Sequence, residues 1–132
     1  MAQRVLEEKA IKVGWPTEIK AQEFRVGITP HAAREAVEHG HEVLMQSGAG
    51  VGAGFHDDDY RAAGAVIVDT AEEVFAKAEM IVKVKEPQPD ERKMLREGQV
   101  LFTYLHLAPD PAQTRDLLES GCTAIAYETV TD

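Results

Sequence analysis

Three side chains that could bind a small anion follow apolar, β-branched runs of the sequence. Arg25 lies in the connection PTEIKAQEFR, Lys85 closes the run MIVKVK just before Pro87, and His106 follows the run QVLFTYL. An arginine guanidinium matches a carboxylate bidentately, and a lysine ammonium stabilises negative charge on a carbonyl oxygen. A histidine can donate to the same oxygen or transfer a proton near neutral pH. The combination suits a small carboxylate that carries a reacting carbonyl.

Each of these residues also has an ordinary structural interpretation. A lysine at a strand end is commonly solvated, a histidine after a strand commonly forms loop hydrogen bonds, and an arginine in a polar loop commonly lies on the surface. Lys83 is two residues from Lys85 and would share its strand face. We assign Lys83 to solvent or to a peripheral salt bridge. Structural or solvent roles are also assigned to the other histidines, which are expected at helix ends or in loops: His31, His39, His41 and His56.

The elements that would position these side chains repeat along the chain. In four places an amphipathic helix pattern ends at a glycine and leads directly into a short β-branched run: residues 31–40 and 41–46, 57–64 and 65–69, 90–98 and 99–105, and 110–121 and 122–128. The glycines are expected to adopt the left-handed conformation that ends helices. They are Gly40, Gly64, Gly98 and Gly121.

Helix starts are marked as clearly, by Thr29 before Pro30 and by Asp110 before Pro111. Further strands at 11–15 and 80–85, with a helix at 70–78 between them, bring the prediction to about six strands and five helices. This alternation predicts an α/β fold, a three-layer sandwich with a mostly parallel, Rossmann-like (flavodoxin-like) sheet.

One domain accounts for residues 11–132, and residues 1–10 are expected to form an amino-terminal extension. Ligands bind beyond the carboxyl ends of the strands in such sheets. Because those ends share one edge of the sheet, Arg25, Lys85 and His106 are expected to converge there.

Composition limits the classes of partner. The formal net charge of −9 argues against nucleic-acid binding, which relies on clustered Lys and Arg. No run approaches the roughly 20 apolar residues that span a bilayer, and the first residues contain no apolar signal core. The single cysteine, Cys122, fits a reducing compartment. We therefore expect a cytoplasmic protein.

Two other motifs could suggest different sites. GAGVGA, which begins at Gly48, matches the dinucleotide pattern G-x-G-x-x-A. That pattern requires a helix that opens within it, whereas here the next helix begins only near Asp57. We interpret the stretch as a flexible loop over the sheet edge or a neighbouring domain. The acid run 57–59 could suggest a metal or phospho-acceptor site, but no acid pair follows the first strand to hold magnesium. It is better explained as helix first-turn acids.

Several segments together resemble the amino-terminal part of bacterial alanine dehydrogenase, from about Ile11 to Asp132. They are VGWPTEIKAQEFRVGITP, HGHEVLMQSGAGVGAGF, YRAAGAVIVDTAEEVFAKAEMIVKVKEP, LREGQVLFTYLHLA and SGCTAIAYETV. The resemblance implies a domain that binds pyruvate or L-alanine. It assigns carboxylate binding to Arg25, and both substrate binding and catalysis to Lys85 and His106. It implies no cofactor-binding or metal-binding residue in this chain.

In that family a separate Rossmann domain binds NAD, and the full-length enzyme is expected to be an oligomer. The chain stops at YETVTD, where the family continues, so it is expected to be a fragment that lacks the NAD domain and is inactive alone. Trp15 replaces the small aliphatic residue expected before Pro16. Two alternatives are the amino-terminal domain of a nicotinamide nucleotide transhydrogenase alpha subunit and a free-standing 2-oxo-acid binding module.

Overall fold

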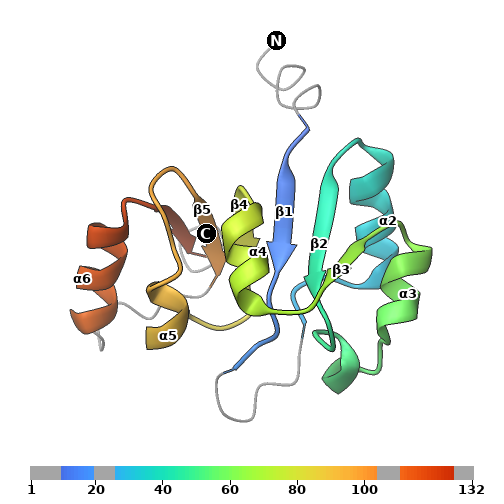
Figure 1. The fold of residues 1–132 in the computed structure, drawn as a ribbon, viewed down its shortest axis with the longest axis horizontal. Coiled ribbons are helices and arrows are strands. Elements are labelled where there is room, and N and C mark those ends of the chain that lie inside the picture. Colours follow the sequence, from blue (N-terminus) through green and yellow to red (C-terminus); the bar gives the residue numbers. More distant parts are fainter. Residues whose placement is uncertain (1–9, 20–25, 104–110, 127–132) are drawn as a thin grey trace.

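The computed structural model describes residues 10–19, 26–103 and 111–126, and shows a parallel six-stranded sheet between two layers of helices (Figure 1). All five neighbouring strand pairs are parallel. The strand order is β3-β2-β1-β4-β5-β6, the doubly wound order in which the chain reverses direction between β1 and β4. The predicted α/β fold is confirmed. The strands are β1 Lys12–Trp15, β2 Glu42–Gln46, β3 Val66–Val68, β4 Met80–Val82, β5 Val100–Thr103 and β6 Thr123–Ala126.

Two hydrophobic clusters show which helices cover each face of the sheet. The described residues form helices α2 Pro30–Glu38, α3 Asp57–Ala62, α4 Ala71–Lys77, α5 Pro89–Arg92 and α6 Pro111–Ser120, with a short 3-10 helix η1 at Val51–Ala53. Ala33 of α2 and Tyr60 of α3 pack with Val13 of β1. On the other face, Val74 of α4 and Leu117 of α6 pack together. Within the described ranges, no helix is long and apolar enough to cross a membrane.

The predicted helix boundaries are largely those observed. Thr29 caps α2, because its Oγ1 accepts a hydrogen bond from the Ala32 N–H at 3.2 Å. Thr70 caps α4 in the same way, with the Glu73 N–H at 3.2 Å. The four glycines expected after helices all have positive φ, between 75° and 99°: Gly40, Gly64, Gly98 and Gly121.

Two elements are shorter than the sequence predicted. The helix expected over 90–98 covers only Pro89–Arg92. A buried ion pair with Lys83 holds Glu91 and a half-exposed pair with Asp116 holds Arg92, and the chain then turns so that Leu95 enters the core. The strand expected over 80–85 ends at Val82.

Gly14, in the middle of β1, allows α4 to pack directly on the strand. A Cβ at this position would lie 2.6 Å from Val74 Cγ1 and 2.8 Å from Ala78 Cβ. Such distances require the helix or the strand to shift, and overpacking of this kind costs about 1–3 kcal/mol.

We therefore expect Gly14→Ala to lower the free energy of unfolding of the chain by about 1–3 kcal/mol. Val74→Ala removes one of the two clashing groups, so the double variant should be less destabilised than the sum of the single changes. Urea unfolding of the four proteins measures this coupling. Additive losses would show that α4 does not contact Gly14 closely.

Candidate functional site

The carboxyl ends of β1 and β4 lie side by side at the point where the connections leave the sheet in opposite directions. The connection after β1 leads to α2 on one face, and the connection after β4 leads to α5 on the other. In Figure 1 the arrowheads of β1 and β2 mark this edge. Ligands of open α/β sheets bind at such a switch point.

A buried carboxylate, Glu18, joins the two strand ends. Its Oε1 accepts a hydrogen bond from Lys83 Nζ at 2.9 Å, and its Oε2 accepts one from the Val84 N–H at 2.8 Å. The Lys85 N–H donates to Oε1 at 3.3 Å. Only 4% of the Glu18 side chain is exposed. Glu18 takes N–H groups that would otherwise extend the β4 ladder, and this explains why the strand ends early.

Lys83 is a buried structural lysine, and its assignment to solvent or a peripheral salt bridge is wrong. Its side chain is 1% exposed and its Nζ lies 2.9 Å from Glu18 Oε1 and 3.0 Å from Glu91 Oε2. Ile81 belongs to the cluster beneath α4. Strand alternation points Lys83 to the same face, where α5 supplies Glu91. Burial raises the pKa of Glu91, although the ammonium of Lys83 opposes the shift.

The backbone of Lys85 is held from both sides, in a bend beyond the end of β4. Its N–H donates to Glu18, and its carbonyl oxygen accepts a hydrogen bond from Thr103 Oγ1 at 2.8 Å. Thr103 is fully buried at the end of the neighbouring strand β5. The Lys85 side chain is partly exposed and makes no hydrogen bond or ion pair with another described residue. This is the placement expected of a lysine that meets a ligand at the carboxyl edge.

Arg25 and His106, the other two predicted site residues, lie outside the described residues. Their convergence with Lys85 therefore stays a prediction. The four remaining histidines occupy the helix ends and loops expected for structural roles. His31 pairs with Glu35 at 3.2 Å, His39 follows α2, His41 accepts from the Ile11 N–H, and His56 precedes α3.

Trp15 is the last residue of β1 and borders the switch point. It is 6% exposed, and a Cβ placed on Gly27 would lie 2.9 Å from its Cδ1 and 3.5 Å from Val82 Cγ1. The absence of a side chain at Gly27 thus leaves room for the indole. Among the described residues, Trp15 Nε1 has no hydrogen-bond partner.

Glu18 and Thr103, which hold the backbone of Lys85, were not predicted from the sequence. A signal for Glu18 was present, because an acid directly after the first strand could balance the two strand lysines. Thr103 carried no signal, because a threonine is ordinary in a β-branched strand.

The glycine-rich stretch is a compact turn in place of the flexible loop that the sequence predicted. The Gly48 N–H donates to Asp57 Oδ1 at 2.8 Å, and Ser47 Oγ donates to Asp57 Oδ2 at 2.7 Å. These hydrogen bonds lower the pKa of Asp57. The next helix begins at Asp57 and holds three acids in its first turn, as expected. A carboxylate of the chain therefore already occupies the N–H group that would open a phosphate-binding loop.

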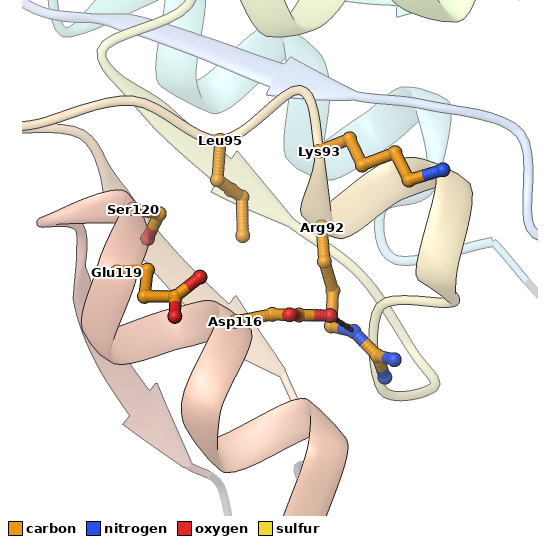
Figure 2. Close-up of a pocket in the computed structure, with 6 residues that line it drawn as sticks. All are labelled: Arg92, Lys93, Leu95, Asp116, Glu119 and Ser120. Carbon is orange, nitrogen blue, oxygen red and sulfur yellow. Dashed lines mark hydrogen bonds and ion pairs between the residues drawn. The ribbon is translucent and has the colours of Figure 1, made fainter.

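A pocket elsewhere in the described part of the chain is not lined by Lys85 or Glu18. Figure 2 shows a pocket of about 220 Å³ between α5 and α6. The guanidinium of Arg92 points to Asp116, with 2.9 Å between Nε and Oδ2, and Arg92 Nη1 also donates to the Pro87 carbonyl. This arginine is thus engaged within the protein. Within the described ranges, no group of three or more metal-ligating side chains could hold a metal ion.

The sheet order defines the chain as a doubly wound α/β domain, and Lys85 lies at the switch point of its carboxyl edge. The family model "Alanine dehydrogenase/PNT, N-terminal domain" matches residues 14–132, and the chain belongs to this family. The resemblance found in the sequence is therefore confirmed.

Similar proteins agree with this assignment. The chain is 55% identical over 118 residues to alanine dehydrogenase of Mycolicibacterium smegmatis and 48% identical over 120 residues to that of Bacillus subtilis. These matches cover 89% and 91% of the chain but only 32% of each relative, so the chain spans about a third of the length of the curated relatives it matches.

Two solved structures superpose closely on this chain. An L-alanine dehydrogenase superposes with a TM-score of 0.87 at 51% identity, over 89% of this chain and 32% of that one. A transhydrogenase from Sinorhizobium meliloti superposes with a TM-score of 0.82 at 26% identity, over 89% and 35%. Alanine dehydrogenases are thus the closer relatives of the two.

Replacement of Lys83 tests the buried ion pairs. Lys83→Met leaves two buried carboxylates without their cation, and we expect it to lower the free energy of unfolding by about 3–5 kcal/mol. Lys77→Met is the matched control, because Lys77 forms an exposed pair with Glu73 and its loss should change stability by no more than about 0.5 kcal/mol. Urea unfolding at pH 7 measures both. Equal effects would contradict the burial of Lys83.

The raised pKa of Glu91 predicts a pH dependence. A carboxyl group with a raised folded pKa contributes stability that is complete below its unfolded value, ordinarily 4.5, and is lost as the pH rises through the folded value. Glu91→Gln remains uncharged and lacks this loss. Its free energy of unfolding relative to the unsubstituted chain should therefore rise from pH 4 upwards and level off above the folded pKa. A difference that is constant with pH in urea unfolding would contradict the shift.

Proposed function

We propose that residues 11–132 form the substrate-binding domain of an NAD-dependent alanine dehydrogenase. This enzyme converts L-alanine, NAD and water to pyruvate, ammonia and NADH. The observation that carries the proposal is the presentation of Lys85 at the switch point, in a chain 48–55% identical to alanine dehydrogenases.

Lys85 is the residue proposed to act on the reacting oxygen. Its backbone is fixed by two hydrogen bonds at the strand ends, whereas its side chain has no partner among the described residues. An ammonium group held in this way stabilises negative charge that develops on the carbonyl oxygen of pyruvate. Lys83 cannot share this role, because two carboxylates already bind its ammonium group.

Arg25 and His106 complete the proposed site. The guanidinium of Arg25 would bind the substrate carboxylate bidentately and so orient the carbonyl towards Lys85. His106 would donate to the same oxygen and transfer a proton during addition or loss of water. The support for these roles is their position after parallel strands and their match to the family motifs.

The glycine-rich loop that begins at Gly48 does not suit the pyrophosphate of NAD. The one loop of suitable sequence directs its Gly48 N–H to Asp57, and α3 begins beyond the motif. We therefore assign NAD binding to another domain of the full-length enzyme. The proposed partners are that domain, pyruvate or L-alanine, and further copies of the enzyme in a cytoplasmic oligomer, with no nucleic acid or membrane.

The similarity to a transhydrogenase supports a second candidate, the corresponding domain of a transhydrogenase alpha subunit. The two candidates differ in substrate. A dehydrogenase domain binds pyruvate, whereas a transhydrogenase reaction transfers hydride between two nicotinamide nucleotides and needs no 2-oxo acid. Calorimetric titration of the 132-residue chain with pyruvate therefore separates them.

Kinetic tests require the complete enzyme, obtained by joining the chain to the part of the M. smegmatis alanine dehydrogenase that it does not match. In this full-length enzyme Lys85→Ala should lower kcat by about 10²–10³-fold, because it removes a charge that stabilises the transition state. Arg25→Lys should instead raise KM for pyruvate about tenfold or more, because a point charge replaces a fork with two hydrogen bonds.

Steady-state NADH oxidation with pyruvate and ammonia measures both effects. Lys77→Ala, on the exposed surface of α4, is the control and should leave kcat within about twofold. A Lys85→Ala enzyme with the kcat of the control would refute the proposed role of Lys85.

A further inference from the structure

Glu18 contacts the segment that carries Lys85 at consecutive backbone positions. Its two oxygens accept the N–H groups of Val84 at 2.8 Å and Lys85 at 3.3 Å, and Oε1 also accepts the Lys83 ammonium at 2.9 Å. We infer that Glu18 is a positioning residue that sets the place of Lys85 for the reaction. The inference rests on the function proposed above.

A carboxylate can accept two consecutive backbone N–H groups and an ammonium group at once, and other side chains cannot. The Lys83 N–H still donates to the Phe102 carbonyl of β5 at 3.1 Å, but the next two N–H groups, of Val84 and Lys85, lie beyond the strand and need other acceptors in a partly buried place. A carboxylate has two oxygens and no hydrogen to donate, and its charge strengthens each bond. A glutamine has one oxygen, and its amide hydrogens would face a backbone N–H or the ammonium of Lys83.

Lys83 fixes Glu18 in turn. At 1% exposure the Lys83 ammonium cannot reach a ligand at the carboxyl edge, but it pairs with Glu18 and is itself held by Glu91 of α5 at 3.0 Å. The two lysines of the KVK sequence therefore have separate tasks. The first holds the carboxylate, and the carboxylate holds the backbone of the second.

Thr103 opposes Glu18 across Lys85. Its Oγ1 donates to the Lys85 carbonyl at 2.8 Å, so the residue is fixed through both of its backbone groups. The connections to β1 and β5 thus determine where the Lys85 side chain begins. A displacement of about 1 Å from the reacting position is enough to lower a rate by about 100-fold.

The test is Glu18→Gln in the full-length enzyme. We expect kcat to fall by about 10- to 100-fold, with KM for pyruvate within about threefold of its original value, because Lys85 is displaced and the carboxylate-binding group is not. Introduced into a Lys85→Ala enzyme, Glu18→Gln should have no further effect on kcat. This non-additivity distinguishes a positioning role from a purely structural one.

Two more variants complete the design. Glu91→Gln removes a carboxylate from the same lysine without contacting the Lys85 backbone, and should lower kcat much less than Glu18→Gln. Glu18→Asp keeps the negative charge but is one methylene shorter. It carries the test if Glu18→Gln does not fold, and should also lower kcat with little change in KM.

The outcomes separate the two proposals. Two results in an active enzyme would overturn the positioning role alone. In the first, Glu18→Gln lowers kcat by the same factor whether or not Lys85 is present. In the second, Glu91→Gln lowers kcat as much as Glu18→Gln does. An unsubstituted enzyme that folds but does not reduce pyruvate overturns the proposed function, and the positioning role with it.

Discussion

The geometry of the carboxyl edge depends on one buried ammonium group, that of Lys83. Removal of an ammonium and two carboxylates from water costs several kcal/mol for each ion, and only close ion pairs and hydrogen bonds offset that cost. The contacts join Glu18, which is 65 residues away in the sequence, to the end of β4 and to α5. Because the ion pairs are satisfied only in this arrangement, they specify where three separate segments meet.

Local patterns were sufficient to predict most of the fold. Helix boundaries are set by local signals: threonine caps, prolines that begin helices and glycines that end them. Because each acts within a few residues, all of them can be recognised in the sequence. The element boundaries that were predicted wrongly depend on contacts between residues far apart in the sequence. The strand beyond Val82 and the helix beyond Arg92 were both predicted too long, because Glu18 and Asp116 redirect the chain from other elements.

The candidate site was likewise predictable only where local signals were sufficient. The position of Lys85 at the carboxyl edge followed from strand direction and the end of an apolar run. Its neighbour Lys83 was misjudged, because two lysines in an extended strand look equivalent until the partner acids are located. Glu18 was not predicted because it binds the backbone beside Lys85, and such a contact depends on how two distant segments meet.

Trp15 gives the chain an internal optical signal. It is the single tryptophan of the sequence, is nearly inaccessible to water, and lies against Gly27 beside the switch point. The emission of an indole moves to longer wavelength when water reaches it, and this chain contains no second indole to obscure the change. A change in the packing around Trp15 at the end of β1 can therefore be followed by fluorescence, without a label.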